Sequence, residues 1–246
     1  MTPFEAAIVI AGGLASGFIN TLAGGGSAIT LPILTELIGP NAANGTNRIA
    51  IQLANLAALG RFAKGKAVPW STALPLLPAA IVGAALGAWS ATLLSPGATR
   101  RVFAVVLIFV AASVLLRPSR WVENREAVLP VGWRQVVFLA IGFYGGFVQA
   151  GVGFLLLLGL VLGAGLDLVK ANGAKVLLIA AYTPVALLLF ASAAQVDVMV
   201  GVVLSIGQVT GAWIAAHLAL KRGAEFVRWI LVAAAVVAAG RMLLAA

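Results

Sequence analysis

A glycine-rich interruption lies within a long apolar segment near the start of the chain: Gly17-Phe18-Ile19-Asn20-Thr21-Leu22-Ala23-Gly24-Gly25-Gly26-Ser27. That segment, residues 4–38, is too long for one crossing, because a bilayer core about 30 Å thick needs roughly 20 helical residues. Three successive glycines favour a break, since glycine destabilises a helix interior. We expect two shorter helices joined by a turn, either as two thin crossings or as a re-entrant hairpin.

The composition predicts one transmembrane domain over residues 1–246. Hydrophobic residues make up 62% of the chain and charged residues 9%, whereas a soluble domain carries about a quarter of its residues as charges. The net charge of +9 is spread singly between apolar runs, which favours topology signals over nucleic-acid binding. The expected partner is the lipid bilayer. The chain has no cysteine and one histidine, His217, so we expect neither a metal site nor another cofactor.

Further apolar segments predict an all-α, polytopic protein. The clearest spans are 45–62, 71–94, 100–117, 172–191, 198–219 and 226–245. A second region, 134–165, is again too long for one helix and is broken by glycines from Gly142 to Gly153. Both interrupted regions fit the broken helices that transporters contain.

The interruptions recur because the chain repeats. Gly13, Gly17, Asn20 and Gly24 match Gly142, Gly146, Gln149 and Gly153, and later matches pair Ala43-Asn44-Gly45 with Ala171-Asn172-Gly173 and Gly87-Ala88-Trp89 with Gly211-Ala212-Trp213. Their shared order indicates a duplication. We assign repeat 1 to about 4–117, a linker to about 118–133 and repeat 2 to about 134–245, with about five helical segments in each repeat.

Basic residues indicate how the repeats are oriented. Arg61, Lys64 and Lys66 place the loop after the 45–62 span in the cytoplasm, whereas its repeat partner, 192–197, carries only Asp197 and belongs outside. The central linker and the 220–228 loop are basic and therefore cytoplasmic. Each half then has an odd number of crossings, so we expect two inverted repeats. Arg100 and Arg101 fall outside in this scheme and count against it.

Polar residues beside the breaks are candidates for a substrate site. Gly24 to Ser27 could present backbone N–H groups to an anion, with Ser27 capping the next helix. Arg48, Gln52 and Asn55 share one face of a helix that opens at Asn44, and Asn172 and Lys175 open its counterpart. The candidate site residues are Asn20, Thr21, Gly24, Gly25, Gly26, Ser27, Asn44, Thr46, Asn47, Arg48, Gln52, Gln149, Asn172 and Lys175.

Each candidate also has a simpler interpretation. The glycines could merely let helices pack closely. Arg48 and Lys175 could be anchors at the membrane surface, and Asn20 and Gln149 could satisfy freed backbone groups. Together, however, helix N-termini, amides and cations suit a small oxyanion.

With the stretch quoted above, Pro32 and Asn44-Gly45-Thr46, the chain resembles the TauE/SafE family of bacterial sulfite and organosulfonate exporters. The resemblance implies export of a small sulfur-containing anion across the bacterial inner membrane, and we expect alternating access. The second half departs from the pattern, because Gly151-Val152-Gly153-Phe154 lacks the triple glycine and the proline.

Other classes stay open. An anion channel shares polar-lined helices with a transporter, and a membrane protein without transport activity would tolerate loss of Asn44 and Arg48. A membrane enzyme is disfavoured because neither paired mid-span acids nor a second histidine is present. The sequence leaves a homodimer open without assigning an interface.

Overall fold

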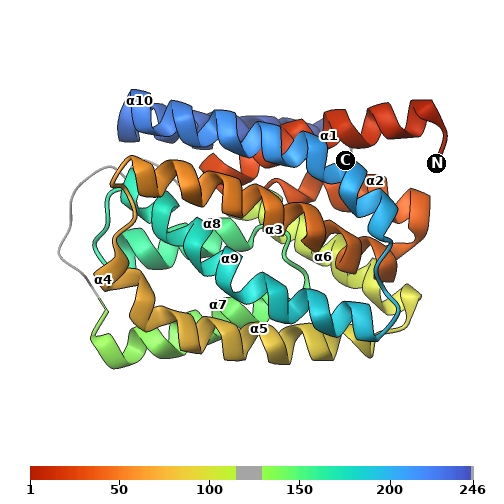
Figure 1. The fold of residues 1–246 in the computed structure, drawn as a ribbon, viewed down its shortest axis with the longest axis horizontal. Helices are drawn as coiled ribbons and strands as arrows, with labels where there is room; N and C mark the ends of the chain where they lie inside the picture. The colour runs from red at the N-terminus through yellow and green to blue at the C-terminus, as the bar shows by residue number, and fades with distance from the viewer. Residues whose placement is uncertain (115–128, 245–246) are drawn as a thin grey trace.

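The computed structural model describes residues 1–114 and 129–244, and the secondary structure within these residues is helical, without a strand (Figure 1). The first half contains α1 (Pro3–Ala23), α2 (Ser27–Ile38), α3 (Pro40–Lys64), α4 (Trp70–Ala73), a 3-10 turn (Leu74–Leu76), α5 (Leu77–Thr92) and α6 (Pro96–Val114). The second half contains α7 (Val131–Phe147), α8 (Val152–Leu158), a π-helical turn (Gly159–Gly163), α9 (Leu168–Ser192) and α10 (Val198–Leu244). Within α10, Gly223 departs from helical geometry with φ 75° and interrupts the helix.

Four helices in the described part are long and apolar enough to cross a membrane: Pro3–Ala23, Trp70–Thr92, Leu168–Ser192 and Val198–Val227. The expected spans 45–62, 172–191 and 198–219 lie within α3, α9 and α10. The ends of the spans 100–117 and 226–245 lie outside the described residues, as does most of the expected linker, 118–133.

Both expected helix interruptions are present, but the second lies earlier than the repeat predicts. The first falls at Gly24–Gly26, where Gly24 adopts φ 81° and donates its N–H to the carbonyls of Ile19 and Asn20. The second falls between Phe147 and Val152, with Gln149 at φ 68° and Gly151 at φ 73°. Gly153, which aligns with Gly24, lies inside α8 instead of in the turn. Gln149 therefore lies in the turn, whereas Asn20 lies in the last turn of α1.

The matched glycines bring the two halves into direct contact. In the upper layer of Figure 1, α1 lies along α10, and in the lower layer α5 lies along α7. Small residues let helix backbones approach closely. Each glycine faces a backbone carbonyl of the partner helix: Gly13 and Gly17 face Leu204 and Gln208, Gly207 and Gly211 face Ile10 and Leu14, Gly83 and Gly87 face Leu139 and Phe143, and Gly142 and Gly146 face Ala80 and Ala84. Both interfaces thus join an element of one half to an element of the other.

The helices α3 and α9 run antiparallel between these layers. Gly45 lies against the carbonyl of Gln195, and Gly173 lies against the carbonyl of Ala67. Near their middle, Gln52 donates from Nε2 to the carbonyl of Ala180 at 3.2 Å. The residues of these contacts match across the two halves at an offset of 128 positions: Gly45 with Gly173, Ala67 with Gln195, and Gln52 with Ala180. The contacts of one half therefore recur in the other.

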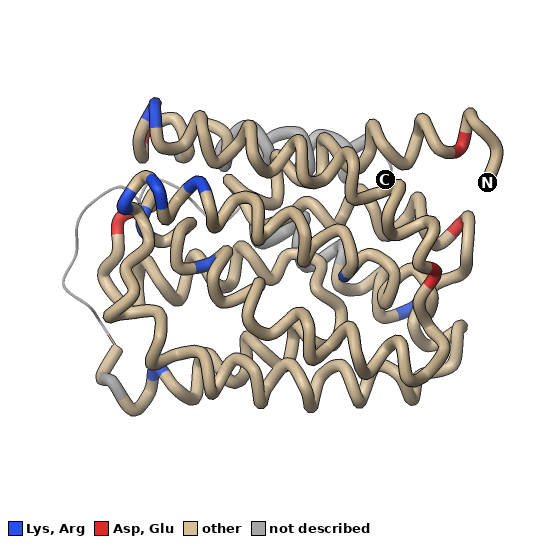
Figure 2. The backbone as a smooth tube through the Cα atoms, viewed as in Figure 1, with Lys and Arg blue, Asp and Glu red and all other residues tan. Residues whose placement is uncertain are grey.

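Charged residues are unevenly distributed along the bundle. Figure 2 shows Lys and Arg gathered mainly at the end drawn at left, where α3 ends. Lys64, Lys66, Lys221 and Arg222 are exposed there. Two of the loops expected in the cytoplasm therefore carry exposed basic residues, whereas Arg117, Arg120 and Arg125 of the central linker lie outside the described residues.

Candidate functional site

Arg48 is a fully buried cation on α3 whose side chain reaches the C-terminal end of α7. Its Nη1 donates to the carbonyl of Gly145 at 3.1 Å and to Oε1 of Gln149 at 3.3 Å. Its Nη2 donates to the carbonyl of Gly146 and to Oδ1 of Asn44 at 3.4 Å. The last carbonyls of a helix lack intrahelical donors and carry partial negative charge, so a guanidinium stabilises this helix end.

Neighbouring side chains complete what we call the Arg48 cluster: Asn44, Arg48, Gln149, Tyr182 and the carbonyls of Gly145 to Phe147. Asn44 donates from Nδ2 to the carbonyl of Phe147 at 2.8 Å. The Tyr182 hydroxyl donates to Oε1 of Gln149 at 3.3 Å, and the ring of Phe190 lies 4.7 Å from the Arg48 guanidinium carbon. Residues of α3, α7, α9 and the second break therefore meet here.

Lys175 makes a matching arrangement at the C-terminal end of α1. Its Nζ donates to the carbonyls of Asn20 at 2.9 Å and Thr21 at 2.7 Å, and to Oδ1 of Asn172 at 2.6 Å. Lys175 and Asn172 are fully buried. We call Asn20, Thr21, Asn172 and Lys175 the Lys175 cluster. Each half thus sends one buried cation to the end of the first helix of the other half.

The burial of both cations overturns the surface-anchor interpretation, because neither side chain is exposed. The two cations are not at matching sequence positions, since Arg48 follows Asn44 by four residues and Lys175 follows Asn172 by three. Repeat matching therefore indicated one cation in each half but gave no signal that both reach helix C-termini.

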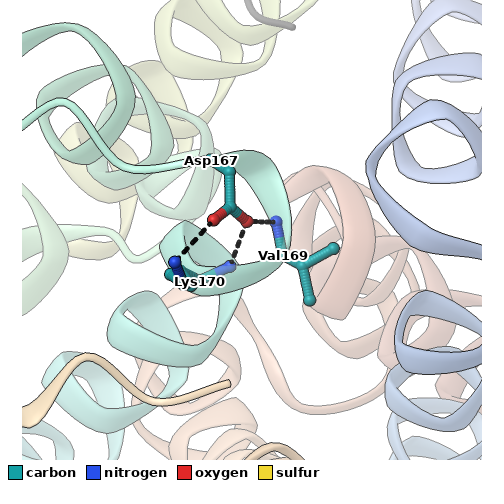
Figure 3. Close-up of polar contacts among 3 residues, drawn as sticks. All are labelled: Asp167, Val169 and Lys170. Atoms are coloured by element: carbon teal, nitrogen blue, oxygen red, sulfur yellow. Dashed lines mark hydrogen bonds and ion pairs between the residues drawn. The ribbon is translucent and has the colours of Figure 1, made fainter. Parts of the chain in front are cut away.

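The expected helix N-termini at Asn44 and Asn172 are wrong. The helices begin four residues earlier, at Pro40 and Leu168, so both asparagines lie in the second turn. Proline at the first helical position pre-sets the backbone of α3. Figure 3 shows that Asp167 caps α9, accepting from the N–H groups of Val169 at 3.0 Å and Lys170 at 2.9 Å. That N-terminus is already bound to a carboxylate.

Other expected site residues form a third group. Asn47 donates from Nδ2 to Oγ of Ser27 at 3.2 Å and accepts from Thr30 at 3.0 Å and Gln208 at 3.2 Å. Ser27 is the first residue of α2, and Gly26 occupies the cap position, so the expected capping by Ser27 is wrong. The list of candidate site residues contains neither Thr30 nor Gln208, and Gln208 joins α10 to α3 and α1.

The glycines of the first break differ in role. A Cβ on Gly24 would collide with the backbone of Gly153, and one on Gly26 would collide with the carbonyl of Ser16. The close-packing interpretation therefore holds for these two. A Cβ on Gly25 would meet no atom within 4 Å, so open space lies beside this residue.

Thr46 and Gln52 lie apart from the three groups. Thr46 accepts the N–H of Asp197 at 2.8 Å and holds the loop after α9, and Gln52 contacts α9 near its middle. The single expected site is therefore divided among several locations.

Unsatisfied donors accompany both cations. Within the described residues, Nε of Arg48, Nε2 of Gln149 and Nδ2 of Asn172 are buried and have no hydrogen-bond partner. In the same part of the chain, no Asp or Glu is buried. An uncompensated buried charge is costly, so this interior favours a group that brings negative charge and acceptors.

Together, the long apolar helices, the exposed apolar side chains such as Leu188 (70%) and Phe4 (75%), and the buried polar clusters define a multi-pass membrane protein with a cationic interior. Among the described residues, no group of three or more His, Asp or Glu could hold a metal ion. The chain belongs to the sulfite exporter TauE/SafE family, whose model matches residues 9–242.

The chain is also similar to curated membrane transporter proteins. It is 30% identical to the probable membrane transporter protein ORF9 of Sinorhizobium sp, over 93% of this chain and 88% of that protein. It is 27% identical to the probable membrane transporter protein YfcA of Escherichia coli K12, over 93% and 86%. A probable membrane transporter protein of Haemophilus influenzae is 26% identical over 90% and 88%. No solved structure matches the chain. The family and these relatives identify a membrane transporter.

Proposed function

We propose that this protein is a secondary transporter of the bacterial inner membrane that exports a small sulfur-containing anion, either sulfite or an organosulfonate. One observation carries the proposal: Arg48 and Lys175 are fully buried, and no carboxylate is buried among the described residues. A bound anion would supply the missing negative charge. The proposed activity is transport and not catalysis.

The unpaired donors suit the chemistry of such an anion. Sulfite and sulfonate groups present several oxygen acceptors that share negative charge, and charge-assisted hydrogen bonds to these oxygens are stronger than neutral ones. Arg48 Nε, Gln149 Nε2 and Asn172 Nδ2 offer N–H groups within or beside the cationic clusters. The name of the family, sulfite exporter TauE/SafE, supports the same substrate class.

Alternating access is the proposed mechanism. In this mechanism the halves, 4–117 and 134–245, are inverted repeats that rock against one another. The recurring cross-half contacts support it, because Gly24 and Gly153 meet where the two breaks approach each other. Gln52 and the carbonyl of Ala180 likewise pair two matched positions. Rigid-body movement of one half around such a centre is the usual mechanism of transporters built from repeats.

The first test is anion binding to the purified protein in detergent, measured as thermal stabilisation. The panel holds sulfite, sulfate, sulfoacetate, taurine, acetate and phosphate, with Arg48→Ala as the test variant and Lys170→Ala as the control. We expect saturable stabilisation by sulfite or sulfoacetate that Arg48→Ala reduces and Lys170→Ala keeps in full. A folded protein that no anion stabilises would overturn the proposed substrate class.

A second measurement separates transport from a channel. In vesicles loaded with unlabelled substrate, a transporter accelerates entry of labelled substrate and saturates as the substrate concentration rises. Flux that rises linearly and ignores the trans substrate would instead assign an anion channel.

A further inference from the structure

The two buried cations lie at different depths in the bundle. Arg48 precedes Gln52 by four residues, and Lys175 precedes Ala180, the contact of Gln52, by five. Because α3 and α9 run in opposite directions, a rise of about 1.5 Å per residue separates the Cα atoms of the two residues by roughly 14 Å along the helix axes. Their charged groups also bind the ends of different helices, α7 for Arg48 and α1 for Lys175.

We infer that the protein has two separate stations for a small oxyanion, one at the Arg48 cluster and one at the Lys175 cluster. The inference rests on the proposed function and divides its site into two. Each station is completed by residues of both halves, because each cation lies at the end of the other half's first helix. The two halves thus share both stations.

Each station has its own unsatisfied donor, which a purely structural helix cap does not require. In the Arg48 cluster, Nε of Arg48 and Nε2 of Gln149 are buried without an acceptor. In the Lys175 cluster, Nδ2 of Asn172 is buried without an acceptor while its Oδ1 accepts from Lys175. No acceptor for these donors lies within residues 1–114 and 129–244. Leaving a buried donor unpaired is costly, so each donor indicates a ligand acceptor at its own station.

The stations are ordered along the molecule. The N-terminal end of α9, which carries Lys175, contacts Ala67, directly after the exposed Lys64 and Lys66. The N-terminal end of α3, which carries Arg48, contacts Gln195 at the opposite end of the bundle. Basic loops mark the cytoplasmic side, so an exported anion meets the Lys175 station first and the Arg48 station second.

The stations also define the chemical class of the ligand. Both offer a cation and amide N–H donors, and neither includes an acidic side chain among the described residues. An oxyanion without an ammonium group fits them, whereas the ammonium of an aminosulfonate would lie near a fixed positive charge. We therefore expect sulfite and sulfoacetate to bind at both stations and taurine to bind more weakly.

The test is the stoichiometry of sulfite binding, measured by isothermal titration of the full-length protein in detergent. We expect two sulfite ions per chain for the unaltered protein and for the exposed control variant Lys170→Met. Arg48→Met and Lys175→Met should each retain one, and the remaining affinity should change by no more than about threefold, because distant sites act nearly independently. The double variant should bind none.

Two further variants keep the test decisive if a cation is needed for folding. Gln149→Asn shortens the amide while retaining a residue type that tolerates positive φ, and Asn172→Ala removes the donor beside Lys175. Each should weaken one of two binding events by about tenfold, since a lost charge-assisted contact has this order of effect.

One outcome separates this inference from the proposed function. A single sulfite per chain that either cation variant abolishes would overturn two stations while leaving an anion transporter in place. Two stations are also overturned if Gln149→Asn and Asn172→Ala weaken the same sulfite-binding event to an equal extent. No binding of sulfite or sulfoacetate to the folded, unaltered protein would overturn both proposals.

Discussion

At both helix breaks, a buried cation binds the carbonyls at the end of a helix, but different residues form the two arrangements. In the first, Gly24 caps α1, and the carbonyls of Asn20 and Thr21 accept from Lys175. In the second, a non-glycine residue, Gln149, takes the left-handed conformation, and the carbonyls of Gly145 and Gly146 accept from Arg48. Both halves place a cation at the end of a broken helix, but with different residue types and spacing. Glycine composition alone is therefore a poor guide to the second break.

The largest expected effect comes from the contact between the breaks. In Gly24→Ala, the added Cβ meets the backbone of Gly153 at a residue with φ 81°, and both effects are destabilising. We expect a loss of roughly 3 kcal/mol or more, or failure to accumulate as folded protein. Unfolding of purified protein in detergent measures the effect. Gly25→Ala is the matched control, because its Cβ meets open space. Equal effects at both positions would contradict the described contact.

The next effect compares the two cations. Arg48→Lys replaces a planar fork that reaches four acceptors with an ammonium that cannot span all of them. We expect a loss of about 2 kcal/mol in the free energy of unfolding and about tenfold weaker sulfite binding. Arg101→Lys, at an exposed position, should change neither quantity. If Arg48→Lys binds sulfite as tightly as the unaltered protein, sulfite binding does not depend on the guanidinium geometry.

A smaller effect distinguishes the matched asparagines. Asn44 bonds both Arg48 and the carbonyl of Phe147, whereas the structure gives Asn172 one bond, from Lys175. Asn44→Ala should cost about 2 kcal/mol and Asn172→Ala about 1 kcal/mol, because each lost bond contributes about 1 kcal/mol. Thermal unfolding of the two variants without ligand gives the order. A larger loss in Asn172→Ala would reverse the comparison.

The smallest expected effect compares the exposed Lys170–Asp167 ion pair with the cap that Asp167 makes at the start of α9. Lys170 pairs with Asp167 at 3.4 Å, with side-chain exposures of 57% and 32% (Figure 3). Exposed pairs contribute little, so Lys170→Met should change stability by less than about 0.5 kcal/mol. Asp167→Ala should cost about 1 kcal/mol, since it removes the cap of α9. Because Asp167→Ala removes both the cap and the ion pair, comparable losses in the two variants would show that the cap contributes little.

Part of the candidate site was predictable from residue type. Polar and charged residues inside apolar segments are costly and usually functional. This rule predicted the candidate site residues Asn44, Arg48, Gln149, Asn172 and Lys175. Their division into two clusters was not predictable, because hydrogen-bond partners about 100 to 155 residues away decide it. Tyr182 is absent from the predicted site for the same reason, since its hydrogen-bond partner, Gln149, lies in the second break.

The sequence was enough to predict a helical membrane protein with two interrupted regions, because hydropathy, glycine runs and repeat spacing can all be read from the order of residues along the chain. It also identified the TauE/SafE family, which the family match confirms. The tertiary structure was needed to show which glycines lie against another helix, where the second break lies and which helix ends bind Arg48 and Lys175. Those outcomes depend on contacts between the halves, where backbone carbonyls at the C-terminal ends of helices accept hydrogen bonds from buried cations. No local pattern encodes the position of a carbonyl on another helix.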